Sequence, residues 1–151
     1  MDLKSKLALH QHLEEILLNR ISQAQQALED IIHSRDNESK SSAGDKYETG
    51  RSMMQQAQQQ QESQLQASIK LLQQLRALKT EKQATQVSLG SLITSNQGLF
   101  YLAIGLGEIH FEDKAYHVIS MASPLAQLLV DKKKGEVFEL RERNYEILLI
   151  S

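Results

Sequence analysis

Hydrophobic residues in the first part of the chain recur at steps of three, four and seven, which keeps them on one face of a helix. This first stripe contains Leu3, Leu7, Leu17, Ile21, Ala24, Leu28 and Ile31. His10 and Glu14 interrupt it where the repeat calls for apolar residues. The pattern fades at HSRDNESK, where Ser, Asn and Asp compete for backbone hydrogen bonds. We therefore predict a long first helix that ends in this polar cluster.

A second stripe begins after Gly50 and contains Leu65, Ile69, Leu72, Leu75 and Leu78. Residues 1–84 contain no proline, so nothing in them breaks a helix. We predict two helices of about 30 residues that pack as an antiparallel coiled-coil hairpin over residues 1–84. Its tip falls at about residues 36–50. Eight glutamines lie between residues 55 and 66, so we expect looser packing toward the tip.

The period changes after about residue 85 to short segments rich in β-branched and aromatic residues, separated by turn-forming clusters. The segments are VSLGSLIT, LFYLAIGL, AYHVISM, EVFEL and YEILLIS. SPLAQLLV predicts a short helix, with Ser123 as N-cap, Pro124 at its first position and Gly135 as a C-terminal cap. Residues 85–151 therefore read as a compact α+β domain with four or five antiparallel strands and one short helix.

Composition narrows the functional classes. The chain has no cysteine, which excludes disulfides, thiolate metal sites and cysteine nucleophiles. The net charge is −2, so the overall balance gives no reason to expect direct nucleic-acid binding. No apolar run approaches the roughly 20 residues that span a bilayer, and the first residues do not resemble a signal peptide. We expect a cytoplasmic protein with no membrane partner.

The segment between the two helices carries two acids, Asp45 and Glu48, three residues apart. In a helix this spacing places both on one face. Such a pair can hold a hard cation such as Mg²⁺ when another molecule supplies the remaining ligands. Alternatively, Asp45 caps the second helix and Glu48 lies in its first turn, near the positive end of the dipole. The two interpretations are compatible, because a cap leaves carboxylate oxygens available.

Taken together, the hairpin pattern, the tip GDKYE and the segment SPLAQLLVDKKKGEVF resemble the bacterial Gre transcript-cleavage factors. That family carries a Gly-Asp-x-x-Glu tip followed, in a small C-terminal domain, by a Ser-Pro segment. The tip match consists of Gly44, Asp45 and Glu48. The C-terminal match consists of Ser123, Pro124, Leu129, Lys132 or Lys133, Gly135 and Val137. The resemblance covers nearly the whole chain.

The resemblance implies a transcription elongation factor whose partner is core RNA polymerase. An FKBP-like C-terminal domain would dock at the rim of the polymerase secondary channel, and the hairpin tip would enter the channel. Asp45 and Glu48 would then share a Mg²⁺ ion with polymerase and promote cleavage of backtracked RNA near its 3′ end. The resemblance implies no cofactor, no catalytic site and no small-molecule substrate for the factor alone. Candidates for docking on polymerase are Ser123, Pro124, Lys132, Lys133 and Gly135.

The tip departs from the family pattern. Tyr47 lies between the two acids, and Thr49, Gly50 and Arg51 follow them. Gly44, Tyr47, Gly50 and Arg51 are therefore candidates for supporting the tip. The positive charge of Arg51 could neutralise the acids or contact RNA phosphate.

These departures leave two other hypotheses open. One is a polymerase-channel regulator without cleavage activity. The other is a coiled-coil adaptor unrelated to polymerase, which would use Leu65, Ile69 and Leu72. A separate metal-dependent nuclease is disfavoured, because two carboxylates alone make a poor Mg²⁺ site.

Overall fold

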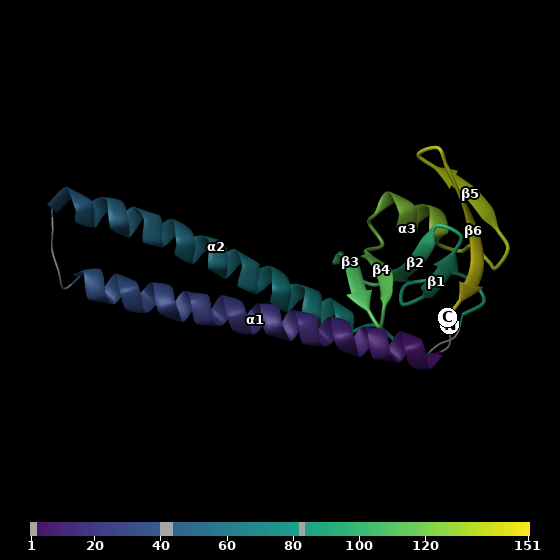
Figure 1. The fold of residues 1–151 in the computed structure, drawn as a ribbon, viewed down its shortest axis with the longest axis horizontal. Coiled ribbons are helices and arrows are strands. Elements are labelled where there is room, and N and C mark those ends of the chain that lie inside the picture. The colour runs from purple at the N-terminus through teal and green to yellow at the C-terminus, as the bar shows by residue number, and fades with distance from the viewer. Residues whose placement is uncertain (1–2, 40–43, 82–83) are drawn as a thin grey trace. The chain divides into compact units, whose positions relative to one another are not determined.

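The computed structural model describes the backbone of residues 3–39, 44–81 and 84–151, and the side chains of these residues except 38–49. The fold is α+β: two long helices are followed by a six-stranded mixed sheet and one short helix (Figure 1). The chain divides into two compact units. One is Glu15–Leu72, and the other combines Met1–Glu14 with Gln73–Ser151. Below they are called the helical unit and the sheet unit.

Two helices form the helical unit, as the periodicity predicts. Helix α1 spans Leu3–Ser39 and helix α2 spans Gly44–Arg76, so α1 and the end of α2 continue into the sheet unit. Within the helical unit they lie side by side and run in opposite directions (Figure 1). Toward the tip, the Arg35 guanidinium donates a hydrogen bond to Gln58 Oε1 at 3.3 Å.

Packing between α1 and α2 weakens along the helical unit, after Ala24 on α1 and before Ser68 on α2. Leu17 and Ala24 on α1 are buried, as are Ser68 and Leu72 on α2. Of the side chains described at residues 25–37 and 50–67, none is buried. Ile32, which follows the predicted stripe, is 39% exposed. The looser packing predicted from the glutamine-rich part of α2 is therefore confirmed.

The sheet contains six strands in the order β3-β4-β2-β1-β6-β5. Their bounds are Leu92–Ser95 for β1, Gly98–Leu102 for β2, Gly107–Phe111 for β3, Lys114–Ile119 for β4, Val137–Leu140 for β5 and Arg143–Ile150 for β6. The expectation of a wholly antiparallel sheet is wrong, because β2 and β4 pair in parallel, with Leu99 beside Tyr116. The other strand pairs are antiparallel.

Strand β3 is the strand that the sequence pattern missed. Its sequence GEIHF has few apolar residues, and none of its side chains is fully buried. It joins β4 through a tight turn in which Glu112 and Asp113 take positive φ of 50° and 62°, without a glycine. Strand β3 lies at the outer edge of the sheet and pairs only with β4. Strand β4 therefore lies between β3 and β2, and it runs parallel to β2.

A hydrophobic core fills the face of the sheet that helix α3 (Pro124–Leu129) covers (Figure 1). Its buried residues are Val87, Ile93, Phe100, Leu102, Ala126, Leu129, Tyr145 and Ile147. Adjacent strand residues point to opposite faces, so Tyr101 points away from this core. The first turns of α1 lie on that second face, where Leu9 and Leu13 are fully buried. The sheet is thus covered on both faces.

Helix α3 begins as predicted and ends differently. Ser123 is its N-cap, accepting a hydrogen bond from the Ala126 N–H at 3.1 Å, and Pro124 follows at the first position. The C-cap is Val130, and Asp131 directly after it adopts a positive φ of 67°. The prediction that Gly135 caps this helix is therefore wrong. Gly135 lies in the turn before β5, where its N–H donates to the Ile147 carbonyl at 2.8 Å.

Candidate functional site

The two acids of the predicted tip lie in the first turn of α2, because the helix begins at Gly44. The side chains of Asp45, Tyr47 and Glu48 are outside the described residues, so their mutual geometry stays a prediction. Gly50 and Arg51 lie further along α2, and Arg51 is exposed.

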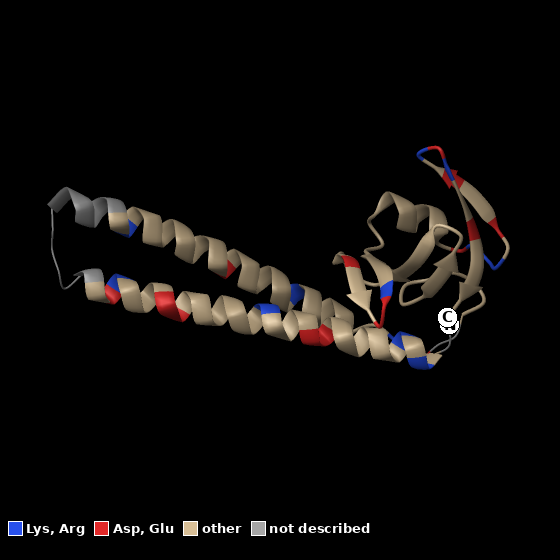
Figure 2. Cartoon of the chain, viewed as in Figure 1, with Lys and Arg blue, Asp and Glu red and all other residues tan. Residues whose placement is uncertain are grey.

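Charge along α2 is concentrated at this end. Residues 44–51 contain Asp45, Lys46, Glu48 and Arg51. The remaining 25 residues of α2, Ser52 to Arg76, contain three charged side chains. Most of this part of the helix is tan in Figure 2.

The candidate docking residues of the sheet unit divide into two groups. Ser123 and Pro124 line a surface hollow of about 540 Å³. Lys132 lies outside its lining, with its ammonium group 5.5 Å from the centre of the Phe138 ring. Lys133 is exposed, and its backbone N–H donates to the Glu136 carboxylate. The structure therefore brings the Ser-Pro pair to a concave surface and leaves the lysines on a neighbouring loop.

Two arginines, Arg141 and Arg143, complete the lining of this hollow, and sequence reasoning missed them. They belong to the cluster RERN, which the sequence marks only as a turn. In the structure Arg141 and Glu142 form a two-residue turn with φ of 52° and 66°, and Leu140 pairs with Arg143 across it. The tight turn brings both arginines to the end of the β5–β6 hairpin that faces the start of α3.

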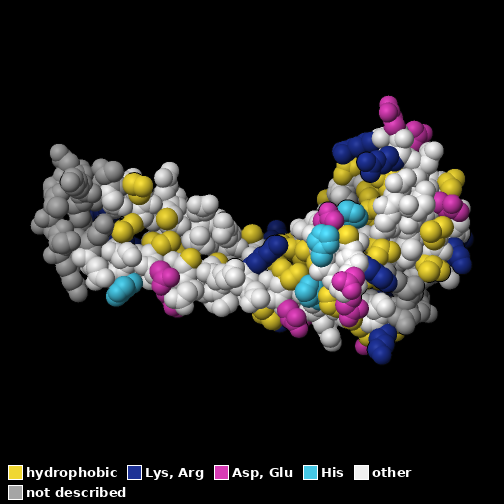
Figure 3. Space-filling view, in the orientation of Figure 1, with side chains coloured by type: hydrophobic (Ala, Val, Ile, Leu, Met, Phe, Trp, Pro, Cys, Tyr) yellow, Lys and Arg dark blue, Asp and Glu magenta, His cyan; other side chains and the backbone are white. Residues whose placement is uncertain are grey.

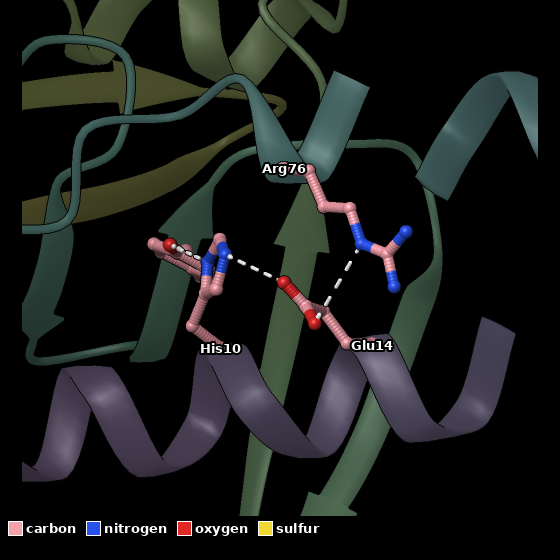
Figure 4. Close-up of polar contacts among 4 residues, drawn as sticks. His10, Glu14 and Arg76 are labelled. Carbon is pink, nitrogen blue, oxygen red and sulfur yellow. Dashed lines mark hydrogen bonds and ion pairs between the residues drawn. The ribbon is translucent and has the colours of Figure 1, made fainter. Parts of the chain in front are cut away.

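A polar network joins α1, α2 and β2 inside the sheet unit (Figure 4). His10 Nδ1 lies 2.9 Å from the hydroxyl oxygen of Tyr101. His10 Nε2 lies 3.7 Å from a carboxylate oxygen of Glu14, whose other oxygen is 3.8 Å from Arg76 Nε. The two residues that interrupt the hydrophobic stripe of α1 are therefore the ones that reach β2 and the end of α2. We call these four residues the brace.

Burial shifts the pKa of His10 and of Tyr101. It lowers the pKa of His10; Glu14 opposes this shift and Lys6 adds to it. It raises the pKa of the Tyr101 hydroxyl. A neutral His10 can accept a hydrogen bond from Tyr101 at Nδ1 and direct its Nε2–H toward Glu14. This arrangement gives Nδ1 a hydrogen bond and places Nε2 near the Glu14 carboxylate, without a buried charge on the imidazole.

A second contact fixes the same part of α1. The ring of His12 stacks on Phe111 of β3, with ring centres 4.6 Å apart. Together with the His10–Tyr101 bond, it anchors the first turns of α1 to two different strands of the sheet. No metal site is assigned to these histidines, because the described residues contain no cluster of three or more His, Asp or Glu side chains suited to holding an ion.

In comparisons with known proteins, no family model and no curated protein matches the chain. None of the helices in the described ranges has the length and hydropathy needed to cross a membrane.

Proposed function

We propose that the chain is a Gre-like factor that binds core RNA polymerase and acts through the tip of its helical unit in the secondary channel. One observation carries this proposal: the acid pair Asp45–Glu48 falls at the start of α2, and the Ser123–Pro124 pair of the same sequence signature caps α3 beside a surface hollow. In this proposal α1 and α2 form an antiparallel coiled-coil hairpin and the sheet unit is FKBP-like.

The dimensions of α2 suit this role. A helix of 33 residues extends about 50 Å at about 1.5 Å per residue. The start of α2 is therefore far from its own end, which suits a part that acts through its tip. The low charge of α2 after Arg51 and the dense charge at its start fit a part that enters a partner and presents its end there.

The acids would supply carboxylate ligands to a metal centre that belongs to polymerase. Mg²⁺ takes oxygen ligands and is commonly held by one or two carboxylates. Two adjacent carboxylates fit a shared ion better than an ion of their own. The chain would therefore not be an enzyme alone; Asp45 and Glu48 would help hold a second Mg²⁺ for attack of water on backtracked RNA.

Arg51 supports a second candidate function, which is occupation of the channel without cleavage. It is exposed on α2 within two turns of Asp45. A guanidinium there can pair with the tip acids, or with RNA phosphate near the 3′ end. The first pairing would reduce the negative charge available to Mg²⁺.

Transcript cleavage by stalled elongation complexes tests the proposal. The chain is compared with a double variant, Asp45→Ala with Glu48→Ala, and with a charge-matched control, Glu29→Ala with Asp30→Ala, at two exposed positions of α1. A cleavage factor speeds cleavage, and only the tip variant loses this effect. A channel regulator instead slows the intrinsic cleavage by polymerase.

An effect of neither kind, together with no binding to polymerase, would overturn the proposal. The adaptor hypothesis would then replace it. Under that hypothesis the tip variant is silent, and changes at Leu65, Ile69 or Leu72 abolish binding to a different protein.

A further inference from the structure

The hollow beside α3 has an apolar lining with a basic rim. Ile119, Pro124, Leu125, Leu140 and Tyr145 contribute hydrophobic surface. Arg141 and Arg143 are exposed beside them, and Ser123 completes the lining, which contains no acidic residue. In the space-filling view, basic side chains lie beside hydrophobic ones where the β5–β6 turn approaches α3 (Figure 3). Such a surface is complementary to a ligand that is both apolar and negatively charged.

The walls of the hollow are held in place by the core. Leu125, Leu140 and Ile119 pack against the buried cluster under α3. Tyr145 stacks on Phe138 with ring centres 5.0 Å apart and planes within 3° of parallel. The Ser123 cap fixes the start of α3 at the opposite side. A ligand therefore meets a surface that is already formed, which reduces the ordering that binding requires.

Both arginines have their charge available. In the part of the chain that the structure describes, neither Arg141 nor Arg143 makes an ion pair. A guanidinium is always protonated and offers a planar pair of donors that matches a carboxylate. The turn holds the two arginines beside one hollow, so a single short ligand can reach both.

We propose that this hollow binds a short acidic segment of another protein, with a hydrophobic side chain in the hollow and carboxylates on Arg141 and Arg143. The inference depends on the lining of the hollow and on its charge, and not on the identity of the partner. It therefore goes beyond the proposed function. If polymerase is the partner, the inference gives the chemistry of the segment that this surface would take.

Charge on the surrounding loop argues against a nucleic acid as the occupant. Residues 131–146 contain five basic and five acidic side chains, so the basic rim does not continue into a basic surface. A phosphate backbone favours a continuous basic track. It would meet Glu139, Glu142 and Glu146 on the same hairpin. A short peptide needs only the two guanidinium groups as partners for its carboxylates.

Fluorescence anisotropy with the full-length chain tests this proposal in the absence of polymerase. The probe is a labelled short peptide with a central Leu-Phe pair flanked by glutamates. Two comparison peptides carry lysines in place of the glutamates, or glycines in place of the Leu-Phe pair. We expect saturable binding of the first peptide and much weaker binding of both others.

Matched variants assign the binding to the hollow. Arg141→Gln with Arg143→Gln removes two positive charges at its rim, and Lys114→Gln with Lys134→Gln removes two from exposed positions outside its lining. We expect the arginine variant to weaken peptide binding by about tenfold or more, since each arginine loses a charge-assisted hydrogen bond, and the lysine variant to bind like the unchanged chain. Circular dichroism is used to check that both variants are folded.

Three results would overturn the proposal: no saturable binding of the acidic peptide, equal binding by the lysine-containing peptide, or an arginine variant that binds as well as the lysine variant. A single-stranded oligonucleotide that binds more tightly than the peptide, and depends on the two arginines, would point to nucleic acid instead. Because polymerase is absent, these outcomes leave the proposed function to its own assay.

Discussion

His10 Nδ1 and the Tyr101 hydroxyl oxygen lie 2.9 Å apart, although the two residues are 91 positions apart in the chain. The contact joins the first turns of α1 to β2, on the face of the sheet opposite the main core. His10, which interrupts the hydrophobic stripe of α1, therefore anchors this helix to β2. A hydrophobic residue at position 10 could fill the same space but could not form a hydrogen bond with the Tyr101 hydroxyl.

Removal of this hydroxyl tests the anchor. Tyr101→Phe leaves the buried His10 Nδ1 without its partner, and we expect a loss of about 1–2 kcal/mol in the free energy of unfolding. Urea denaturation measures this loss. The control is Tyr145→Phe, because the Tyr145 hydroxyl makes no hydrogen bond within the described part of the chain. If both variants lose equal stability, the hydrogen bond is not the anchor.

Protonation of His10 should make stability depend on pH. Burial lowers the pKa of His10 in the folded chain below its ordinary value of about 6.5, so the unfolded chain takes up this proton first. The contribution of neutral His10 is complete above pH of about 6.5 and is lost as the pH falls toward the lower, folded pKa. Glu14 favours protonation, whereas Lys6 opposes it, and neither reverses the direction.

Denaturation between pH 7.5 and pH 5 measures this effect. His10→Gln should flatten the pH dependence. His33→Gln changes an exposed histidine of α1 and should leave the dependence as it is. An unchanged dependence in the His10 variant would assign the effect to other groups.

Neighbouring leucines of α1 should differ in their contributions to stability. Leu17 is fully buried, whereas Leu18 is 45% exposed. Leu17→Ala should lower the free energy of unfolding by about 2–5 kcal/mol, because it removes buried methyl groups and leaves a cavity. Leu18→Ala should change it by less than about 1 kcal/mol. Thermal denaturation of both variants measures the difference, and equal melting temperatures would contradict the packing of α1 described above.

The cap of α3 gives a separate prediction. Ser123→Ala removes the acceptor for the Ala126 N–H and should lower stability by about 0.5–2 kcal/mol. Ser123→Asp keeps an acceptor at the N-cap and should restore most of this loss. Chemical denaturation of the two variants checks the order. If aspartate is as destabilising as alanine, Ser123 contributes through something other than its cap.

The sequence was most informative where one simple period continued for many residues. The stripes of α1 and α2 predicted both helices, and the glutamines predicted the loose packing near the tip. Ser123 and Pro124 predicted the start of α3, because capping is a local interaction. The end of α3 was not predicted. Glycine is the usual residue with positive φ after a helix, so Gly135 was the expected cap, whereas Asp131 adopts the positive φ in the structure.

Long-range contacts could not be predicted from local pattern. The sequence of β3 is polar, like that of a loop. Without this edge strand in the prediction, the parallel pairing of β2 with β4 could not be predicted either. His10 looked like a defect in the stripe, because its partner lies 91 residues away. Arg141 and Arg143 looked like turn residues, and only the fold brings them beside Ser123. The acids at positions 45 and 48 were suggested by motif resemblance, and their geometry stays a prediction.

Binding of the purified chain to its cognate core RNA polymerase tests the central proposal most directly. Biolayer interferometry with immobilised chain measures the affinity for the unchanged protein and for the tip variant Asp45→Ala with Glu48→Ala. We predict saturable binding that the tip variant retains, because docking would depend on the sheet unit and the acids would act only in the channel. No saturable binding of polymerase to the unchanged chain would contradict the proposed function.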